Sequence, residues 1–189
     1  KIGPIEKVVC THFHVDHCSG WLELIKQPGN FLIYFHSDAI PFVSGKKRMD
    51  MPGFSDFKDI MFPVMKENRY VPTVKEMIST YSFGTTFKSR FPMDRVTFFH
   101  SDDEVVPDFK TVHTPGHRPE SVSFYKQESG ILISGDFIIV INGRIVVNTY
   151  VYDINKQRES VEKVKKLKNL MTLLPGHGEV VDFNEKLLI

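Results

Sequence analysis

Short apolar and β-branched segments recur along the chain, and turn-forming residues separate them. Segments this short, bounded by turns, are typical of half-buried or buried strands. The pattern therefore predicts nine strands, at Lys7–Thr11, Phe31–Phe35, Val96–Phe99, Phe109–His113, Ser121–Tyr125, Ile131–Ser134, Ile138–Ile141, Ile145–Val147 and Met171–Leu174.

Helical periodicity is clearest near the C-terminus. We expect a helix over Lys156–Asn169, because apolar residues recur at helical spacing, at Val161, Val164, Leu167 and Leu170. Lysines fill the other positions, and we interpret them as a solvated helix face and not as a nucleic-acid patch. Two shorter helices are predicted at Trp21–Lys26 and Val74–Tyr81.

The region 41–95 has many methionines, phenylalanines and prolines but little clean periodicity. We expect an irregular, partly helical insertion between two strands; in compact domains such long insertions are usually lids or binding loops, or are disordered. A basic run, Lys46–Arg48, lies near the apolar residues Met49, Met51, Phe54 and Phe57. This pattern fits a lid for an anionic, partly apolar substrate, and it also fits an exposed loop.

The composition excludes several functional classes. The chain has 189 residues, with 24 lysines and arginines against 23 aspartates and glutamates, and a formal charge of +1. This balance argues against a broad surface for nucleic acid or an anionic membrane. There is no apolar run long enough to span a membrane and no signal-peptide pattern. With only two cysteines, the sequence favours a reducing compartment, so we expect one cytoplasmic domain over residues 1–189.

Histidines and aspartates gather directly after the first predicted strand. His12 and His14 are two residues apart, so in extended chain both imidazoles project from one face. Asp16 and His17 follow, where a turn can direct a carboxylate and a further nitrogen toward a neighbouring ion. Nitrogen and carboxylate oxygen are the ligands of catalytic zinc, and of iron or manganese.

Three more strands end in the same kinds of side chain. His117 lies in a Thr-Pro-Gly-His turn, and His177 lies in a Pro-Gly-His-Gly turn. Asp136 follows the apolar strand Ile131–Ser134. A carboxylate at a buried strand end needs a partner, and a metal ion supplies one.

In this order, the four motifs resemble those of the metallo-β-lactamase-fold hydrolases, over residues 5–181. The resemblance implies an α+β fold, an αββα four-layer sandwich with a dinuclear metal site at the shared edge of two sheets. It implies two divalent ions, zinc first and iron or manganese as alternatives. Asp136 would bridge the two ions, and Asp16 is also our candidate catalytic residue. The implied ligands are His12, His14 and His117 for the first ion and Asp16, His17 and His177 for the second.

The complete His-x-His-x-Asp-His motif is most similar to the thioesterase, lactonase, glyoxalase II and ribonuclease Z branches. We therefore expect a hydrolase in which a metal-bridging hydroxide attacks a small ester, thioester or lactone. Two alternatives stay open, namely a nuclease or phosphodiesterase of the same fold and a metal-binding domain without catalysis. The expected partner is a small-molecule substrate, and neither a membrane nor a nucleic acid is expected.

In the resembled family a strand-rich segment usually precedes the first histidine motif, whereas only 11 residues precede His12 here. We therefore expect an incomplete first sheet, exposed apolar surface near the N-terminus and lower stability than the length implies. His36, His100 and His113 end predicted strands without a surrounding motif, so structural roles are expected for them. Cys18 is interpreted as a small residue packed in a tight turn.

Overall fold

The computed structural model of the chain describes residues 3–18, 20, 24, 26, 29–47, 55, 57–67, 73, 93–101 and 103–183. Two predicted helices, Trp21–Lys26 and Val74–Tyr81, lie outside these residues apart from Leu24 and Lys26. The nine predicted strands are all confirmed; two have the predicted bounds, and the ends of the others differ by one or two residues.

The first sheet consists of three parallel strands in the order β1-β2-β3. Their bounds are Lys7–Val9, Leu32–His36 and Val96–Phe99. The second sheet has five strands in the order β10-β9-β6-β5-β4, and a two-stranded sheet pairs β7 with β8. The bounds of β4 to β10 are Lys110–His113, Val122–Lys126, Ile131–Gly135, Ile138–Ile141, Arg144–Val147, Thr172–Pro175 and Val181–Asp182. Only β10 was not predicted, because two residues are too short to show a period.

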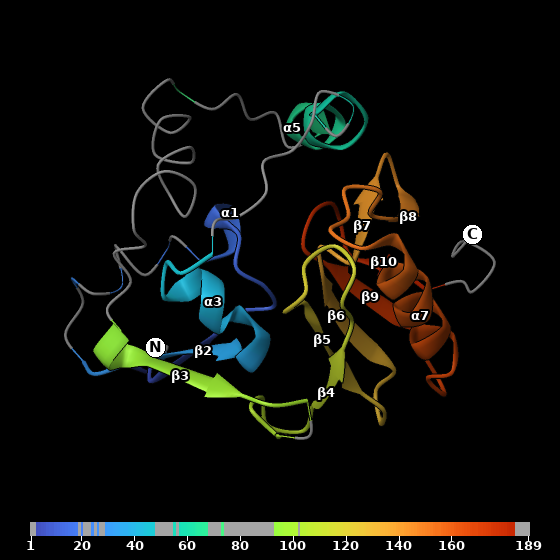
Figure 1. Cartoon of the computed structure of the whole chain (residues 1–189). Helices are drawn as coiled ribbons and strands as arrows, with labels where there is room; N and C mark the ends of the chain where they lie inside the picture. The colour runs from blue at the N-terminus through green and yellow to red at the C-terminus, as the bar shows by residue number, and fades with distance from the viewer. Residues whose placement is uncertain are drawn as a thin grey trace.

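The described helices are short, except for one. The described α-helices α1, α3 and α5 lie in the first half of the chain, and α7 lies near its end (Figure 1). The segment between β2 and β3 contains α3, η2, α5 and η3, which agrees with a partly helical insertion. The helices are α1 (Val15–Cys18), η1 (Ser37–Ala39), α3 (Ile40–Val43), η2 (Phe57–Met61), α5 (Phe62–Glu67), η3 (Met93–Arg95) and α7 (Ile154–Lys165).

Two sheets pack face to face, and helices lie on their outer sides (Figure 1). Alternate side chains of each strand point to opposite faces. On β2, Phe35 packs with α3, whereas Tyr34 belongs to the cluster between the sheets. On β6, Ile133 belongs to that same cluster, whereas Leu132 packs on the other face with Val164 of α7. The four-layer α+β arrangement expected from the sequence is therefore confirmed.

The helix α7 begins two residues before its predicted start and ends four residues before its predicted end. Asp153 sets the start, since its carboxylate accepts hydrogen bonds from the backbone N–H groups of Asn155 and Lys156. The predicted end was too late, because Leu167 and Leu170 pack against the hydrophobic cluster from outside the helix. The apolar residues thus keep their three-residue spacing past the residue at which the helix ends.

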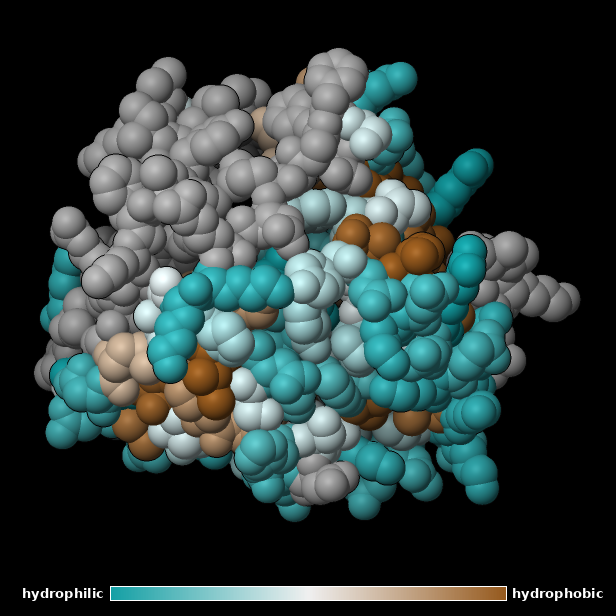
Figure 2. All heavy atoms as spheres, in the orientation of Figure 1, coloured by the Kyte–Doolittle hydropathy of each residue, from teal (hydrophilic) through white to brown (hydrophobic). Residues whose placement is uncertain are grey.

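The outer surface of α7 is hydrophilic, as Figure 2 shows. The lysines of this segment are exposed, which confirms the solvated face; they are Lys163, Lys165, Lys166 and Lys168. Ile5 and Leu32 are also exposed, at 47% and 39%. Across the described residues, no helix combines the length and apolar character that crossing a membrane requires.

Leu173 of β9 tests the packing between the second sheet and α7. It is fully buried, so its replacement by alanine leaves a cavity, and we expect Leu173→Ala to lower the free energy of unfolding by about 2–5 kcal/mol. Met171, in the preceding turn, is 63% exposed and serves as the matched control, with an expected change within about 0.5 kcal/mol for Met171→Ala. Urea unfolding of both variants measures the difference, and equal losses would contradict this view of the core.

Candidate metal centre

The strand directions bring the predicted site residues to one edge of the structure. In the second sheet, β6 and β9 are parallel, and β4 runs in the same direction because two antiparallel pairings separate it from β6. Their C-terminal ends therefore share an edge, and His117, Asp136 and His177 follow these ends. The turn after β1 delivers His12 to the same place, and the backbone N–H of Val122 bonds to the Thr11 carbonyl between the two sheets.

A first group consists of His12, His14, His117 and Asp136, whose candidate ligand atoms all lie within 4.8 Å of one another. The Nδ1 atom of His14 is 3.1 Å from Nε2 of His12 and 3.1 Å from Nε2 of His117. Both Nε2 atoms are 3.8 Å from Oδ2 of Asp136. Three imidazole nitrogens and one carboxylate oxygen thus face a common point.

A second group consists of Asp16, His17, Asp136 and His177. The Nε2 atom of His17 is 3.0 Å from Oδ1 of Asp136, and Nε2 of His177 is 3.3 Å from Oδ2 of Asp136. The Oδ2 atom of Asp16 lies 3.1 Å from Nε2 of His177. Asp136 belongs to both groups, so all seven residues predicted from the sequence are brought together.

The two groups differ in their exposure to solvent. His12, His117 and Asp136 are buried, whereas the Asp16 side chain is 51% exposed. His17 and His177 are partly buried. Water and a substrate can therefore approach from the side of the second group, while the first group is anchored in the interior.

Burial keeps the first group of histidines neutral. Desolvation lowers the pKa of His12 and His14 well below the usual range, and the neighbouring histidines His17 and His117 add to this effect. The pKa of His117 is also lowered, mainly by burial, although the Asp136 carboxylate opposes the shift. A neutral imidazole is the form that binds a metal ion.

The second group contains ionised carboxylates. Burial opposes ionisation of Asp136, but the charge and hydrogen bond of His17 outweigh it and hold the Asp136 pKa well below its usual range. For Asp16, burial is likewise outweighed by the hydrogen bond from His177, and the Asp16 pKa is lowered. Against the effect of burial, Asp136 and Asp16 raise the pKa of His177 to about 10. Without a cation, His177 is therefore protonated and balances the carboxylates.

Hydrogen bonds to the other ring nitrogens orient the buried histidines. Nδ1 of His12 lies 3.1 Å from the Thr11 hydroxyl, and Nδ1 of His117 lies 2.6 Å from the Tyr150 carbonyl oxygen. With Nδ1 as the donor to this carbonyl, Nε2 of His117 presents its lone pair to the first group. The Gln157 side chain of α7 accepts a hydrogen bond of 2.9 Å from the His117 backbone N–H.

Buried charges support the turn that carries His12 and His14. Arg118 and Glu120 are each 1% exposed, and the Arg118 Nε atom lies 3.4 Å from Oε1 of Glu120. The same Glu120 oxygen accepts a hydrogen bond from the backbone N–H of Phe13, between the two histidines. The turn after β4 thus holds the turn after β1 in place. The sequence reasoning did not find Glu120, Tyr150 or Gln157.

Gly176 is required by the close packing around Asp136. A Cβ atom at this position would overlap Oδ1 of Asp136, and it would lie 2.9 Å from Cε1 of His17. Gly116 has φ 145°, and a Cβ atom there would overlap Gln157. Both glycines of the Pro-Gly-His turns therefore let the backbone approach the site residues.

The other histidines lie beside this site and have hydrogen-bond partners. His36 Nε2 contacts the Ser101 hydroxyl, His113 Nε2 contacts the Pro119 carbonyl, and His100 Nδ1 contacts the Ser37 hydroxyl. His36 and His113 also stack, with Asp38 nearby, and form a third His/Asp group. The ring nitrogens of these residues take part in structural hydrogen bonds, in line with their expected roles.

Cys18 is buried, as its expected role in a tight turn requires. Its thiol donates a hydrogen bond to the His14 carbonyl. Burial raises the pKa of the Cys18 thiol well above its ordinary value, so this thiol is not a nucleophile.

The donor set fits divalent metal ions. Around a tetrahedral ion with ligands at about 2.0–2.2 Å, neighbouring ligand atoms are about 3.3–3.6 Å apart, close to the separations found in both groups. Nε2 of His17 and Oδ1 of Asp136 are buried and lie 3.0 Å apart, and neither has a further hydrogen-bond partner among the described residues. Such atoms are costly to bury unless a cation or another polar group satisfies them.

Fold and site together define an α+β protein with two adjoining His/Asp groups suited to metal ions. The family model of the metallo-beta-lactamase superfamily matches residues 1–177, and the chain belongs to this superfamily. Superfamily membership and the His/Asp groups indicate binding of divalent metal ions.

One curated protein, of whose length this chain spans less than two thirds, and two solved structures are similar to it. The probable metallo-hydrolase YflN of Bacillus subtilis is 25% identical over 186 residues, which cover 92% of this chain and 64% of YflN. The protein ST1585 of Sulfolobus tokodaii has a TM-score of 0.64 and 19% identity, over 99% of this chain and 66% of that one. TTHA1623, solved in a di-iron-bound form, has a TM-score of 0.59 and 19% identity, over 96% of this chain and 73% of that one. These structures show the shared fold.

The raised pKa of His177 predicts a pH dependence for the metal-free protein. Because this pKa rises from 6.5 to about 10 on folding, the protonated form stabilises the fold fully below pH 6.5, and this stabilisation is lost as the pH rises through 10. We expect the chelator-treated protein to lose stability over this range, and His177→Gln to lose less. Chemical unfolding at several pH values measures the difference, and identical slopes would contradict a protonated His177.

Gly176→Ala tests the close approach to Asp136 without removing a candidate ligand. The added methyl group must displace Asp136 or His17, so we expect metal content after equilibration with zinc to fall by at least half. Gly20→Ala is the control, since a Cβ atom there meets no atom within 4 Å. Elemental analysis measures the metal content of both variants. A normal metal content in Gly176→Ala would contradict the requirement for glycine at this position.

Proposed function

We propose that the chain is a dinuclear metal-dependent hydrolase that acts on a small ester, thioester or lactone. In this proposal His12, His14 and His117 hold one divalent ion, and a second group holds the other. Asp16, His17 and His177 form that second group, and Asp136, which belongs to both groups, would help to hold both ions. Zinc is the proposed metal, and the same donor set suits iron or manganese.

The observation that carries the proposal is the position of Asp136. Its two carboxylate oxygens lie within 3.8 Å of nitrogen atoms from both groups. Six other candidate ligands, from the segments that follow β1, β4 and β9, converge on this one buried carboxylate. A carboxylate shared by two donor sets is the arrangement that supports two adjacent cations.

Two bound divalent ions would supply a hydroxide nucleophile near neutral pH and would polarise the oxygen of the scissile group. The residues of the site have protonation states that suit this chemistry. The buried His12 and His117 stay neutral and keep their Nε2 lone pairs directed into the site. Asp16 is ionised and half-exposed, and we propose that its carboxylate accepts the proton of the attacking water.

The nature of the substrate follows from charge and access. The formal charge of +1 supports a small molecule in preference to a nucleic acid, whose binding needs many phosphate contacts. Asp16 is the half-exposed member of the second group, so we propose that a carbonyl group approaches from its side. We propose in addition that the insertion 41–95 contributes to substrate binding. In support, Ile60 and Val64 of this insertion pack against Ile139 of β7.

Hydrolysis of defined substrates by the metal-loaded protein tests this function. We expect turnover of thioesters or lactones with two equivalents of zinc, and loss of activity on chelation. His12→Ala should lower kcat/KM by at least a thousandfold, because it removes a buried donor of the first group. His100→Ala is the control, since His100 is an exposed histidine outside both groups, and its activity should stay within twofold of the wild type.

The same assay separates the alternative functions. Bis(p-nitrophenyl) phosphate and a labelled RNA are included with the ester, thioester and lactone substrates. Faster cleavage of the phosphodiesters would contradict the proposal and indicate a nuclease or phosphodiesterase. Two bound ions with no hydrolysis of any substrate would indicate a metal-binding domain without catalysis.

A further inference from the structure

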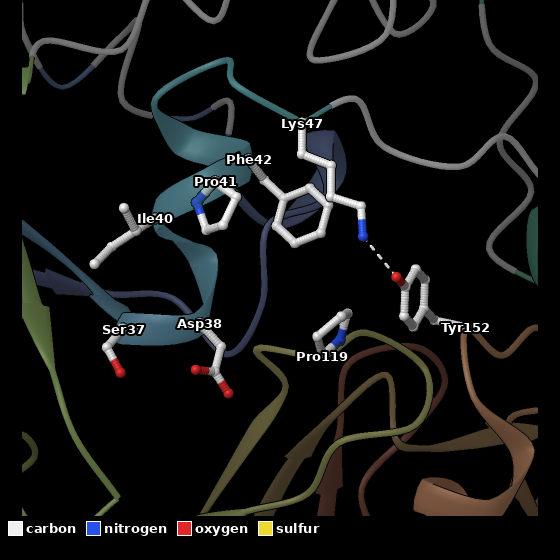
Figure 3. A pocket seen from close by; sticks show the side chains of 8 residues that line it. All are labelled: Ser37, Asp38, Ile40, Pro41, Phe42, Lys47, Pro119 and Tyr152. Carbon is white, nitrogen blue, oxygen red and sulfur yellow. Dashed lines mark hydrogen bonds between the residues drawn. The ribbon is translucent and has the colours of Figure 1, made fainter.

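An open pocket of about 500 Å³ lies beside the turn that carries His117. Figure 3 shows that α3 and Lys47 form one side of this pocket, and that Pro119 and Tyr152 face them from later segments. Eight residues line it, namely Ser37, Asp38, Ile40, Pro41, Phe42, Lys47, Pro119 and Tyr152. The seven candidate metal ligands are not among them, so this pocket is distinct from the metal centre.

The pocket wall is attached directly to the metal centre. Pro119 follows His117 by two residues, and the backbone N–H of Tyr152 bonds to the carbonyls of Gly116 and His117. Two residues before Tyr152, the Tyr150 ring stacks on the His14 ring, with centroids 6.0 Å apart. A molecule held in the pocket would therefore lie beside the turns that carry two of the candidate ligands.

Lys47 places a positive charge at one end of the pocket. Its ammonium group donates a hydrogen bond of 2.6 Å to the Tyr152 hydroxyl, and it lies 4.8 Å from the centroid of the Tyr152 ring (Figure 3). Lys126, Lys156 and Lys165 pair with carboxylates, but among the described residues no carboxylate oxygen lies within 4.0 Å of the Lys47 ammonium. The Lys47 ammonium group can therefore still form an ion pair with an anion.

The other lining residues make the two ends of the pocket chemically different. Ile40, Pro41 and Phe42 of α3 form an apolar wall, and Ile40 is 41% exposed. Asp38 lies on the opposite side from Lys47, as Figure 3 shows. Asp38 repels an anion, while Lys47 attracts it, so an amphipathic ligand would direct its anionic end toward Lys47.

We propose that this pocket binds the carboxylate end of a substrate whose apolar segment leads to the scissile carbonyl. The Lys47 ammonium and the Tyr152 hydroxyl donate hydrogen bonds to the carboxylate oxygens, and Phe42 and Pro41 contact the apolar segment. A carboxylate has two acceptor oxygens, which matches these two neighbouring donors. This substrate class rests on the proposed hydrolase function, whereas binding of a free carboxylate at the pocket does not.

Binding to the metal-free protein tests the pocket independently of catalysis. Hexanoate is titrated into chelator-treated wild type, Lys47→Met and Tyr152→Phe, and Kd is measured by calorimetry. Loss of a charged hydrogen bond predicts a Kd about tenfold or more weaker for Lys47→Met, and a smaller loss for Tyr152→Phe. Lys46→Met is the matched control, because Lys46 does not line the pocket, and its Kd should be unchanged.

Kinetics with the zinc-loaded protein tests the substrate class. Two thioesters of equal length are compared, one with a terminal carboxylate and one with a terminal carboxamide. Lys47→Met should raise KM about tenfold for the carboxylate alone, with kcat unchanged, and Lys47→Arg should restore most of the difference.

Three outcomes would overturn the inference. Wild type that does not bind hexanoate would exclude the pocket, and so would equal losses in Lys46→Met and Lys47→Met. Equal effects of Lys47→Met on both thioesters would exclude the substrate class. If hexanoate binding depends on Lys47 while no thioester is cleaved, the pocket stands and the hydrolase function fails.

Discussion

One buried carboxylate holds the whole site together. Asp136 lies against histidines of both groups, and the rest of the arrangement depends on its remaining ionised in the interior. A buried anion is unfavourable unless positive charge or hydrogen bonds compensate it. Histidines from the segments that follow β1, β4 and β9 supply this compensation, and Gly176 leaves the space that the carboxylate needs. The stability of the site and its proposed affinity for cations therefore have the same origin.

The two sheets explain why such a site can form at an edge and not in the centre of the fold. Strand interiors are occupied by apolar contacts, such as those of Leu132 and Leu173, which hold the strands rigidly. The chain leaves the sheet at the C-terminal ends, where short turns with glycines can direct polar side chains toward one point. Polar contacts beneath these turns, from Glu120 and Gln157, then limit their movement.

The pocket beside the metal centre is formed in part by residues of the insertion 41–95. The segment from Ser37 to Lys47 follows β2, and its residues face Pro119 and Tyr152 from the second half of the chain (Figure 3). The proposed reaction would thus take place at the metal-binding turns, and the charged, partly apolar wall of the pocket would bind the substrate. The basic run near residue 47 was open to two interpretations in the sequence, and the proposed binding role rests on the contact of Lys47 with Tyr152.

The amino-acid sequence alone determined nine of the ten described strands, the seven candidate ligands and the superfamily, because short apolar segments and the order of the histidine and aspartate motifs can be recognised without the structure. It did not determine the end of α7, where Leu167 and Leu170 keep their apolar spacing after the helix has stopped. Gln157 lies at helical spacing from Val164, so a polar residue on the buried face was a signal that could have been found. Only the tertiary structure brought Glu120 to Phe13 and Lys47 to Tyr152, because residues more than 100 positions apart leave no local pattern.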